Sequence, residues 1–333
     1  MTLTAPRFWW EGGPAGWLLS PIGTLVGAIA ARRMARAPDG RLSIPVICVG
    51  NPTVGGAGKT PTAIALAAML KGEGLNPAFL LRGYGGRLSG PTAVDPALHR
   101  AADVGDEALL LATHGPTVIS GDRLVGGRLA EAAGADIIVM DDGFQNPGLF
   151  KDVSVLVVDA AVGIGNGRVT PAGPMRAPLA PQLQKADAVI LVGEGAPGER
   201  VAEAAKVASL PVLFARLVPT GAGVLRGRRV LVFAGIGRPA KVADTAREAG
   251  AEVVRLLAFP DHHPYTEADA RGLLDQADRE GLMLVTTEKD RARLAGGTGA
   301  SAALAERAVA LAVTLAFEDP AAVRRVLAGV LEI

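Results

Sequence analysis

Residues 46–70 constrain the fold most strongly, because they order a strand, a glycine-rich turn and a helix as a phosphate-binding loop does. Their sequence is VICVGNPTVGGAGKTPTAIALAAML. Gly58, Lys59 and Thr60 match the end of the motif GxxxxGK[ST], whereas Thr53 stands where its first glycine is expected. A glycine-rich connection that merely starts a helix is the alternative, but Lys-Thr directly after glycine has little use in such a connection. We therefore predict a phosphate-binding loop.

In such a loop, backbone N–H groups converge on phosphate oxygens at the N-terminus of a helix. The Lys59 ammonium is expected at the terminal phosphates and the Thr60 hydroxyl on Mg²⁺. The predicted nucleotide-binding residues are Thr53, Val54, Gly55, Gly56, Ala57, Gly58, Lys59 and Thr60.

A second motif, Ile137-Ile138-Val139-Met140-Asp141-Asp142, ends an apolar run in two aspartates. A carboxylate at the carboxyl edge of a strand is the Mg²⁺-supporting partner that a phosphate-binding loop requires. Two adjacent carboxylates repel each other unless a cation is near. Capping of a helix or turn explains one of the pair but not both. We predict that Asp141 binds the metal and that Asp142 lies close behind it.

Short apolar runs alternate with Ala-rich helical stretches along the rest of the chain, which predicts parallel βαβ units in an α/β fold with helices on both faces of the sheet. The 333 residues suffice for two domains. We place a boundary near Gly221, with a phosphate-binding domain over 37–220 and a smaller α/β domain over 221–333. The net charge of +1 argues against nucleic-acid binding through a basic field. Cys48 is the single cysteine, which excludes a disulfide framework and is compatible with a reducing cytosol.

The N-terminal residues 1–36 contain all three tryptophans, Trp9, Trp10 and Trp17, followed by an apolar stretch and then by three arginines. The apolar stretch over 18–31 contains Pro21 and falls short of the roughly 20 residues that span a bilayer. Charges that follow the apolar part do not fit a signal peptide. The pattern favours a helix lying in a membrane interface. The alternative is a helix packed on the protein's own core.

Eight motifs occur in the order found in the tetraacyldisaccharide 4'-kinase family, the lipid A kinases of Gram-negative bacteria, which the chain resembles from about residue 10 to 320. They are residues 51–60 (NPTVGGAGKT), 82–85 (RGYG), 105–107 (GDE), 122–123 (DR), 141–145 (DDGFQ), 171–176 (PAGPMR), 259–262 (FPDH) and 287–290 (TEKD). Threonine at the first glycine position belongs to the family form of the loop.

The resemblance implies transfer of the ATP γ-phosphate to the 4'-hydroxyl of a tetraacylated disaccharide 1-phosphate. It places the enzyme at the cytoplasmic face of the inner membrane, in peripheral or monotopic association, and implies no protein partner. Asp106 resembles the catalytic base and His262 its partner from the second domain, while the neighbouring His263 stays a rival. Asp142 is the next candidate for the base.

Phosphate groups of substrate or nucleotide are expected to be bound by Arg82, Arg123 and Arg176, since guanidinium groups are bidentate donors. A structural ion pair is the alternative for each arginine. The chain departs from the family pattern at Asn146, where histidine is expected, and at Ala177, where glutamate is expected. Both departures leave the roles of those side chains open.

Two other protein classes share parts of the pattern. Partition-type ATPases carry a lysine just before the paired glycines, where this chain has Val54. A soluble small-molecule synthetase with a phosphate-binding loop would explain the loop and the aspartates, but not the tryptophan-rich start.

Overall fold

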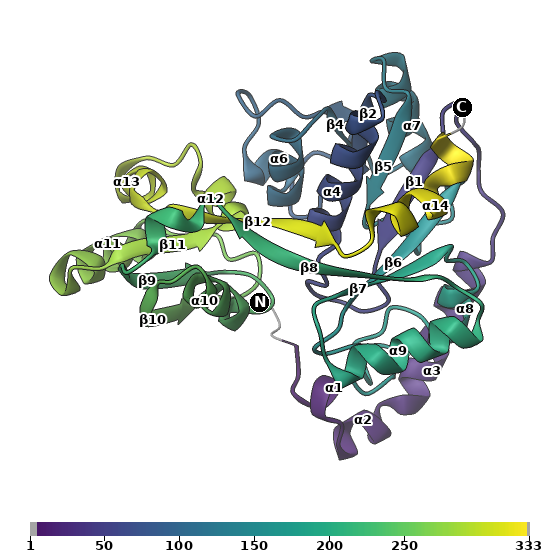
Figure 1. Cartoon of the computed structure of the whole chain (residues 1–333), viewed down its shortest axis with the longest axis horizontal. Coiled ribbons are helices and arrows are strands. Elements are labelled where there is room, and N and C mark those ends of the chain that lie inside the picture. Colours follow the sequence, from purple (N-terminus) through teal and green to yellow (C-terminus); the bar gives the residue numbers. More distant parts are fainter. Residues whose placement is uncertain (1–4, 332–333) are drawn as a thin grey trace.

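Twelve strands form one sheet in the computed structural model, which describes residues 5–331 (Figure 1). The strand order is β10-β9-β11-β12-β8-β7-β6-β1-β5-β2-β4-β3. The strands are β1 (Val46–Gly50), β2 (Pro77–Leu81), β3 (Thr92–Ala93), β4 (Thr117–Ile119), β5 (Ile137–Asp141), β6 (Val153–Asp159), β7 (Ala188–Val192), β8 (Val212–Thr220), β9 (Arg229–Ala234), β10 (Glu252–Ala258), β11 (Met283–Thr287) and β12 (Val309–Phe317).

Helices cover both faces of the sheet. They are α1 (Phe8–Glu11), α2 (Pro14–Leu18), α3 (Ser20–Met34), α4 (Lys59–Gly72), α5 (Ala101–Val104), α6 (Asp106–Ala112), α7 (Arg123–Ala132), α8 (Leu179–Leu183), α9 (Ala196–Val207), the 3₁₀-helix η1 (Ala222–Leu225), α10 (Pro239–Glu248), α11 (Glu267–Glu280), α12 (Glu288–Leu294), α13 (Gly299–Arg307) and α14 (Pro320–Leu331). The predicted α/β class, with a mostly parallel sheet and helices on both faces, is confirmed.

The central strand β1 pairs in parallel with β5 and with β6. Its five residues are all buried, as expected for a strand covered on both faces. Helix α4 packs on one face, where Leu66 and Leu70 join the larger apolar cluster, and Met34 and Phe144 belong to the cluster on the other face. The carboxyl ends of β1 and β5 therefore meet at one edge, where ligands bind in open α/β sheets.

The last strand and helix return to the first half of the chain. Strand β12, which the sequence analysis missed, pairs in parallel with β11 and antiparallel with β8 (Figure 1). Helix α14 then places Val323, Leu327 and Val330 in the same apolar cluster as α4. The domain boundary near Gly221 stays a prediction. Residues 320–331, which that boundary assigns to the second domain, pack instead on the phosphate-binding half of the chain.

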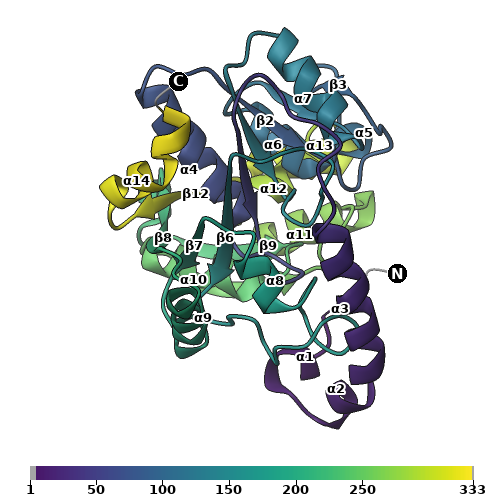
Figure 2. The same cartoon turned by 90° about the vertical axis from the view of Figure 1, so that its right-hand side faces the viewer.

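The N-terminal helices α1–α3 lie together at one end of the molecule (Figure 2). Helix α3 packs through small residues, since a Cβ atom at Gly23 would lie 2.6 Å from the carbonyl oxygen of Val169. Its other face exposes Ile22, Leu25 and Ile29, each by more than half of its surface. One face is thus packed on the protein, as the alternative interpretation expected, and the other has the apolar surface expected of an interfacial helix. Within residues 5–331, no helix combines the length and the hydropathy needed to cross a membrane.

Candidate active site

The phosphate-binding loop joins β1 to α4 and is held by a neighbouring segment around Pro174. The Val54 N–H donates to the carbonyl oxygen of Pro174 at 2.8 Å, and Thr53 forms a β-bridge with Met175. Among the described residues, the non-glycine positions with positive φ do not include Thr53. The loop needs a positive φ at Gly55 and Gly58 instead. A threonine therefore replaces the first glycine without backbone strain.

Thr60 and Asp141 meet at the carboxyl edge of the sheet, as predicted. The Thr60 hydroxyl donates to Asp141 Oδ2 at 2.9 Å, and both residues are buried. The second oxygen, Asp141 Oδ1, is buried and has no hydrogen-bond partner among the described residues. Burial raises the pKa of Asp141 to about 7, and repulsion from Glu107 adds to this. A buried carboxylate with an unused oxygen beside a hydroxyl is a donor set suited to a divalent cation.

Asp142 is held by two cations from different segments. Arg176 donates to its two carboxylate oxygens at 2.8 and 3.0 Å, and the Lys59 ammonium lies 3.9 Å from Oδ2. Burial alone would raise the pKa of Asp142, but the charges of Lys59 and Arg176 outweigh it and hold the pKa below its ordinary value. Arg176 also donates to the carbonyl oxygen of Thr53 at 3.0 Å. Its guanidinium thus joins Asp142 to the phosphate-binding loop.

Asp106 and His262 come from opposite halves of the chain and meet beside this loop. His262 Nδ1 lies 3.1 Å from Asp106 Oδ2, although the residues are 156 positions apart. The hydrogen bond that His262 donates to Asp106 is the main reason why the pKa of His262 is raised. His262 has φ of 56° and meets the Tyr84 ring edge-on, with centroids 5.7 Å apart. The predicted pair is thus formed in the structure.

His263 points elsewhere. Its Nε2 atom lies 3.0 Å from Asp269 Oδ2, and its ring stacks on Phe259 with centroids 4.8 Å apart. The structure therefore separates the two adjacent histidines: His262 contacts Asp106, whereas His263 belongs to a local cluster of the second half.

Arg293 is a residue of this site that the sequence analysis missed. Its Nε donates to Asp106 Oδ2 at 2.6 Å, and its Nη1 donates to Asp290 Oδ1 at 2.6 Å. Asp106 and Asp290 are buried, and only 7% of the Arg293 side chain is exposed. Arg293 lies one helical turn after Asp290 of the TEKD motif. A basic residue at that spacing was the only available signal in the sequence.

A second ion pair joins the halves next to the first one. Lys289 Nζ lies 2.5 Å from Glu107 Oε1. The charge of Lys289 is the largest cause of the lowered pKa of Glu107. For Asp106, burial alone would raise the pKa, but the His262 hydrogen bond and the charges of Arg293 and Lys289 hold it well below its usual range. Asp106 is thus an ionised carboxylate with three cationic or donating neighbours.

The other predicted phosphate-binding arginines differ in burial. Arg123 is buried at the start of α7, and its guanidinium donates to the carbonyl oxygen of Ser120. Burial lowers the pKa of Arg123, and repulsion from Arg82 lowers it further. Arg82 is exposed after β2 and has no hydrogen bond to another described residue. Of the two, Arg82 has the guanidinium that is open to a ligand.

The two departures from the family pattern occupy different environments. Ala177 is fully buried in the apolar cluster under α3. Asn146 accepts a hydrogen bond from the Gly148 N–H at 2.8 Å and lines a separate pocket.

Comparison with known proteins decides the family. The model of the family described as tetraacyldisaccharide-1-P 4'-kinase (LpxK) matches residues 15–332. This chain belongs to the tetraacyldisaccharide 4'-kinase family. A tetraacyldisaccharide 4'-kinase of Methylobacterium sp. strain 4-46 is 53% identical over 99% of this chain and 98% of the relative. One of Xanthobacter autotrophicus is 54% identical over 96% of this chain and 94% of the relative.

A solved structure of a family member has the same architecture. LpxK from Aquifex aeolicus, an "apo" form in complex with ATP, matches with a TM-score of 0.74 and 26% identity. The match covers 96% of this chain and all of that chain. The resemblance read from the eight motifs is therefore confirmed over nearly the whole length.

Proposed function

We infer that this protein is an ATP-dependent kinase that phosphorylates the 4'-hydroxyl of tetraacyldisaccharide 1-phosphate in lipid A biosynthesis. The family match carries this conclusion, and the site geometry is consistent with it. A phosphate-binding loop, a buried carboxylate beside a threonine hydroxyl, and a carboxylate–imidazole pair meet at one edge of the sheet. Phosphoryl transfer depends mainly on positioning and charge neutralisation, and these groups supply both.

Thr60 and Asp141 are the residues that would hold Mg²⁺. The unused Asp141 Oδ1 and the neighbouring hydroxyl fit this ion, which usually keeps several waters and takes only one or two protein oxygens beside the phosphates. Bound Mg²⁺ neutralises charge that develops on the transferred phosphoryl group. Asp141 has no cation within salt-bridge distance among residues 5–331, in keeping with a site that receives its positive charge from the ligand.

Lys59 and the amides of residues 53–60 bind the nucleotide phosphates in this proposal. Lys59 is buried near Asp142, so its ammonium is preorganised before the nucleotide arrives. Asp106 receives the proton of the sugar hydroxyl, with His262 as its partner. Arg176 positions Asp142 and the phosphate-binding loop. The exposed Arg82 contacts substrate phosphate, and the buried Arg123 supports the neighbouring chain through the carbonyl oxygen of Ser120.

The membrane surface at the cytoplasmic face of the inner membrane is the proposed location. Ile22, Leu25 and Ile29 form an exposed apolar face over about two turns of α3. Trp17 and Leu18 precede it in the chain, with 70% and 81% of their surfaces exposed. Arg32 and Arg33 follow in the last turn of the helix. Such a helix can lie in the interface with its apolar side among acyl chains. A substrate with several acyl chains could then be phosphorylated without leaving the bilayer.

A kinase assay with labelled ATP and the disaccharide lipid tests the proposal. The wild-type protein should form a 4'-phosphorylated product in the presence of Mg²⁺. Lys59→Ala should abolish turnover with the fold intact, because it removes a positive charge that meets the terminal phosphates. Absence of the product with folded wild-type protein would reject the function, and wild-type rates in Lys59→Ala would remove the loop from the mechanism.

A further inference from the structure

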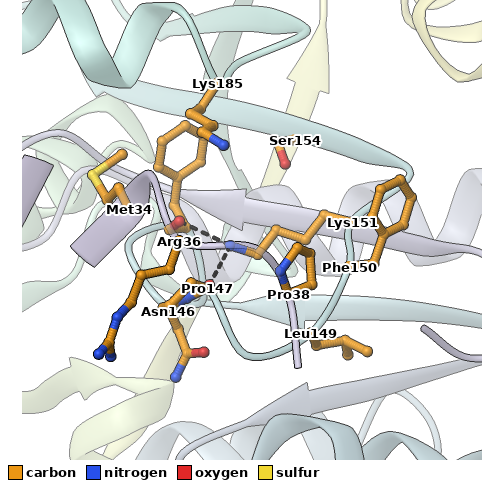
Figure 3. A pocket seen from close by; sticks show the side chains of 11 residues that line it. Met34, Arg36, Pro38, Asn146, Pro147, Leu149, Phe150, Lys151, Ser154 and Lys185 are labelled. Atoms are coloured by element: carbon orange, nitrogen blue, oxygen red, sulfur yellow. Dashed lines mark hydrogen bonds between the residues drawn. The ribbon is translucent and has the colours of Figure 1, made fainter. Parts of the chain in front are cut away.

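The loop over residues 144–151 contributes to a positively charged pocket (Figure 3), whose lining includes neither Lys59 nor Asp106. Its volume is about 200 Å³. Apolar and polar side chains line it together: Met34, Arg36, Pro38, Phe144, Asn146, Pro147, Leu149, Phe150, Lys151, Ser154 and Lys185. Three of these residues are cationic and none is acidic.

Lys151 is fixed within this pocket. Its ammonium donates to the carbonyl oxygens of Phe144 and Asn146 at 2.8 and 2.7 Å, which leaves its third N–H for another acceptor. Burial lowers the pKa of Lys151, and repulsion from Lys185 contributes. Figure 3 shows the amino groups of both lysines directed toward the middle of the pocket. Two ammonium groups that share one space favour an anion between them.

No carboxylate of the described chain neutralises these cations. Arg36, Lys151 and Lys185 form no salt bridge within residues 5–331. Asp152 Oδ2 accepts from the Val46 N–H at 2.8 Å, and Asp187 Oδ2 accepts from the Ser154 N–H at 2.7 Å. Asp39 follows Pro38 and lies beside Gly148, but it is not among the residues that line the pocket.

Ser154 adds a further donor to the pocket. Its side chain lines the cavity, its residue is buried, and its hydroxyl has no hydrogen bond to another described residue. Lysine ammonium groups with a hydroxyl form the donor set that recognises a phosphate group. The apolar walls suit the organic part of a phosphate ester.

The pocket adjoins the end of the helix with the exposed apolar face. Met34 is the last residue of α3, and Arg36 and Pro38 follow it directly. If the apolar face of α3 lies among acyl chains, the polar end of that helix reaches the level of lipid headgroups. We propose that the pocket formed around Lys151, Lys185 and Ser154 binds the phosphate group of a membrane lipid.

Two lipids can supply that phosphate: an anionic phospholipid of the bilayer, or the substrate through its 1-phosphate. The second source rests on the proposed function, whereas the first does not. In either case the bound phosphate lies next to the carbonyl groups of Phe144 and Asn146, in the loop that begins at Asp141 and Asp142. The pocket therefore links lipid binding to the loop that directly follows the strand with the proposed metal ligand.

Vesicle flotation tests the phospholipid source with the full-length protein. The probes are phosphatidylcholine vesicles with and without phosphatidylglycerol, and the variants are Lys185→Gln, Lys185→Arg and, as a matched control, Lys206→Gln on the exposed face of α9. Lys185→Gln should weaken binding to the phosphatidylglycerol vesicles about fivefold, the usual effect of one cation near an anionic surface. Lys185→Arg should restore binding, and Lys206→Gln should change it little.

A kinase assay in neutral detergent micelles tests the substrate source. If the 1-phosphate occupies the pocket, Lys185→Gln raises the KM for the disaccharide 1-phosphate several-fold and leaves the KM for ATP unchanged. Wild-type protein should then show the same rise with an acceptor that lacks the 1-phosphate. Weaker flotation of Lys185→Gln with phosphatidylglycerol vesicles supports the site and identifies a phospholipid as the source of the phosphate. A raised KM of Lys185→Gln for the disaccharide 1-phosphate in micelles supports the site and identifies the substrate as the source.

The proposal is overturned if Lys185→Gln and Lys206→Gln behave alike in both assays. The flotation result stands even for a protein without kinase activity, so failure of the proposed function is distinguishable from failure of the pocket. Lys151 is left unchanged in these variants, because its loss would also free the two carbonyl groups that it holds.

Discussion

Asp141 and Asp106 lie at the same edge of the sheet and are both buried, yet their charge environments are opposite. Asp141 has a hydroxyl neighbour and an unused oxygen, and its pKa is raised to about 7. Asp106 contacts His262 and Arg293, and its pKa is held well below the usual range. The first carboxylate forms no salt bridge within the described residues, whereas the second receives positive charge directly from the other half of the chain.

The difference in charge suits the two carboxylates to two different functions. The groups around Asp141 come from strand β5 and from the start of helix α4, which packs on the sheet. The groups around Asp106 come from segments 156 and 187 residues away. The first site is suited to binding a metal and a nucleotide. The second depends on the second half being in place, so it can connect proton transfer to the position of that half.

The largest effect is expected for Asp141→Asn. Loss of the proposed metal ligand should lower kcat about 10⁴-fold, because several kcal/mol of charge stabilisation are lost in the transition state. The metal-free variant should nevertheless unfold at a higher temperature than wild type at pH 8. A carboxyl with a raised pKa binds its proton more tightly in the folded state, so wild-type stability falls as pH rises from about 4 to 7.

Thermal unfolding at pH 4 and pH 8 with chelator present measures this difference. At pH 4 the two proteins should unfold at similar temperatures, since Asp141 is then protonated when folded. If wild type and Asp141→Asn unfold at equal temperatures at pH 8 as well as at pH 4, the charge of Asp141 is already compensated in the folded protein. The contrast between Asp141 and Asp106 would then be wrong.

The next effect in size is expected at the Asp106–His262 pair. Asp106→Ala, His262→Ala and the double variant should each lose about 10³-fold in kcat, because a general base and its partner act as one unit. ATP affinity should change little. His263→Ala is the matched control and should be mild, since His263 contacts Asp269. Multiplicative losses in the double variant would separate the two residues and make Asp142 the next candidate for the base.

Arg293→Gln should have a smaller effect on rate and a large one on stability. Removing one partner of a buried ion pair costs about 3–5 kcal/mol of unfolding free energy. The pKa of Asp106 should rise, because a cation that lowers it is gone, and the acidic limb of the kcat profile should move to higher pH. Arg291→Gln, on the exposed side of the same helix, is the control. An unchanged pH profile would limit Arg293 to a structural role.

The smallest effect is expected at the exposed face of α3. Leu25→Gln with Ile29→Gln should raise the KM for lipid a few-fold and reduce sedimentation with vesicles, because each change removes an apolar side chain from the proposed interface. The KM for ATP should stay unchanged. Leu98→Gln alters an equally exposed apolar residue in a loop and is the control. Deletion of residues 1–36 is a poorer test, since Trp9 Nε1 donates to the carbonyl oxygen of Pro171 and anchors this region.

Local sequence patterns predicted most strands and the meeting of Thr60 with Asp141 at the carboxyl edge of the sheet, because buried parallel strands are continuous apolar runs. The run over 137–140 became β5, and the Lys-Thr pair became the start of α4. Strand β12 and the position of Arg293 were missed. Both depend on pairing between segments far apart in sequence, which periodicity does not encode. In the sequence, only the FPDH motif distinguished His262 from His263. The contact between His262 and Asp106 became evident only in the folded structure.

The return of β12 and α14 to the first half has a consequence for synthesis on the ribosome. Residues 320–331 close the apolar cluster around α4, so that cluster stays incomplete until this segment has left the exit tunnel. The phosphate-binding loop can form early, but its supporting helix gains its last neighbours about 250 residues later. Contacts of such long separation slow folding. Ribosome-bound chains that end before α14 should therefore stay sensitive to protease in the segment around Leu66 and Leu70.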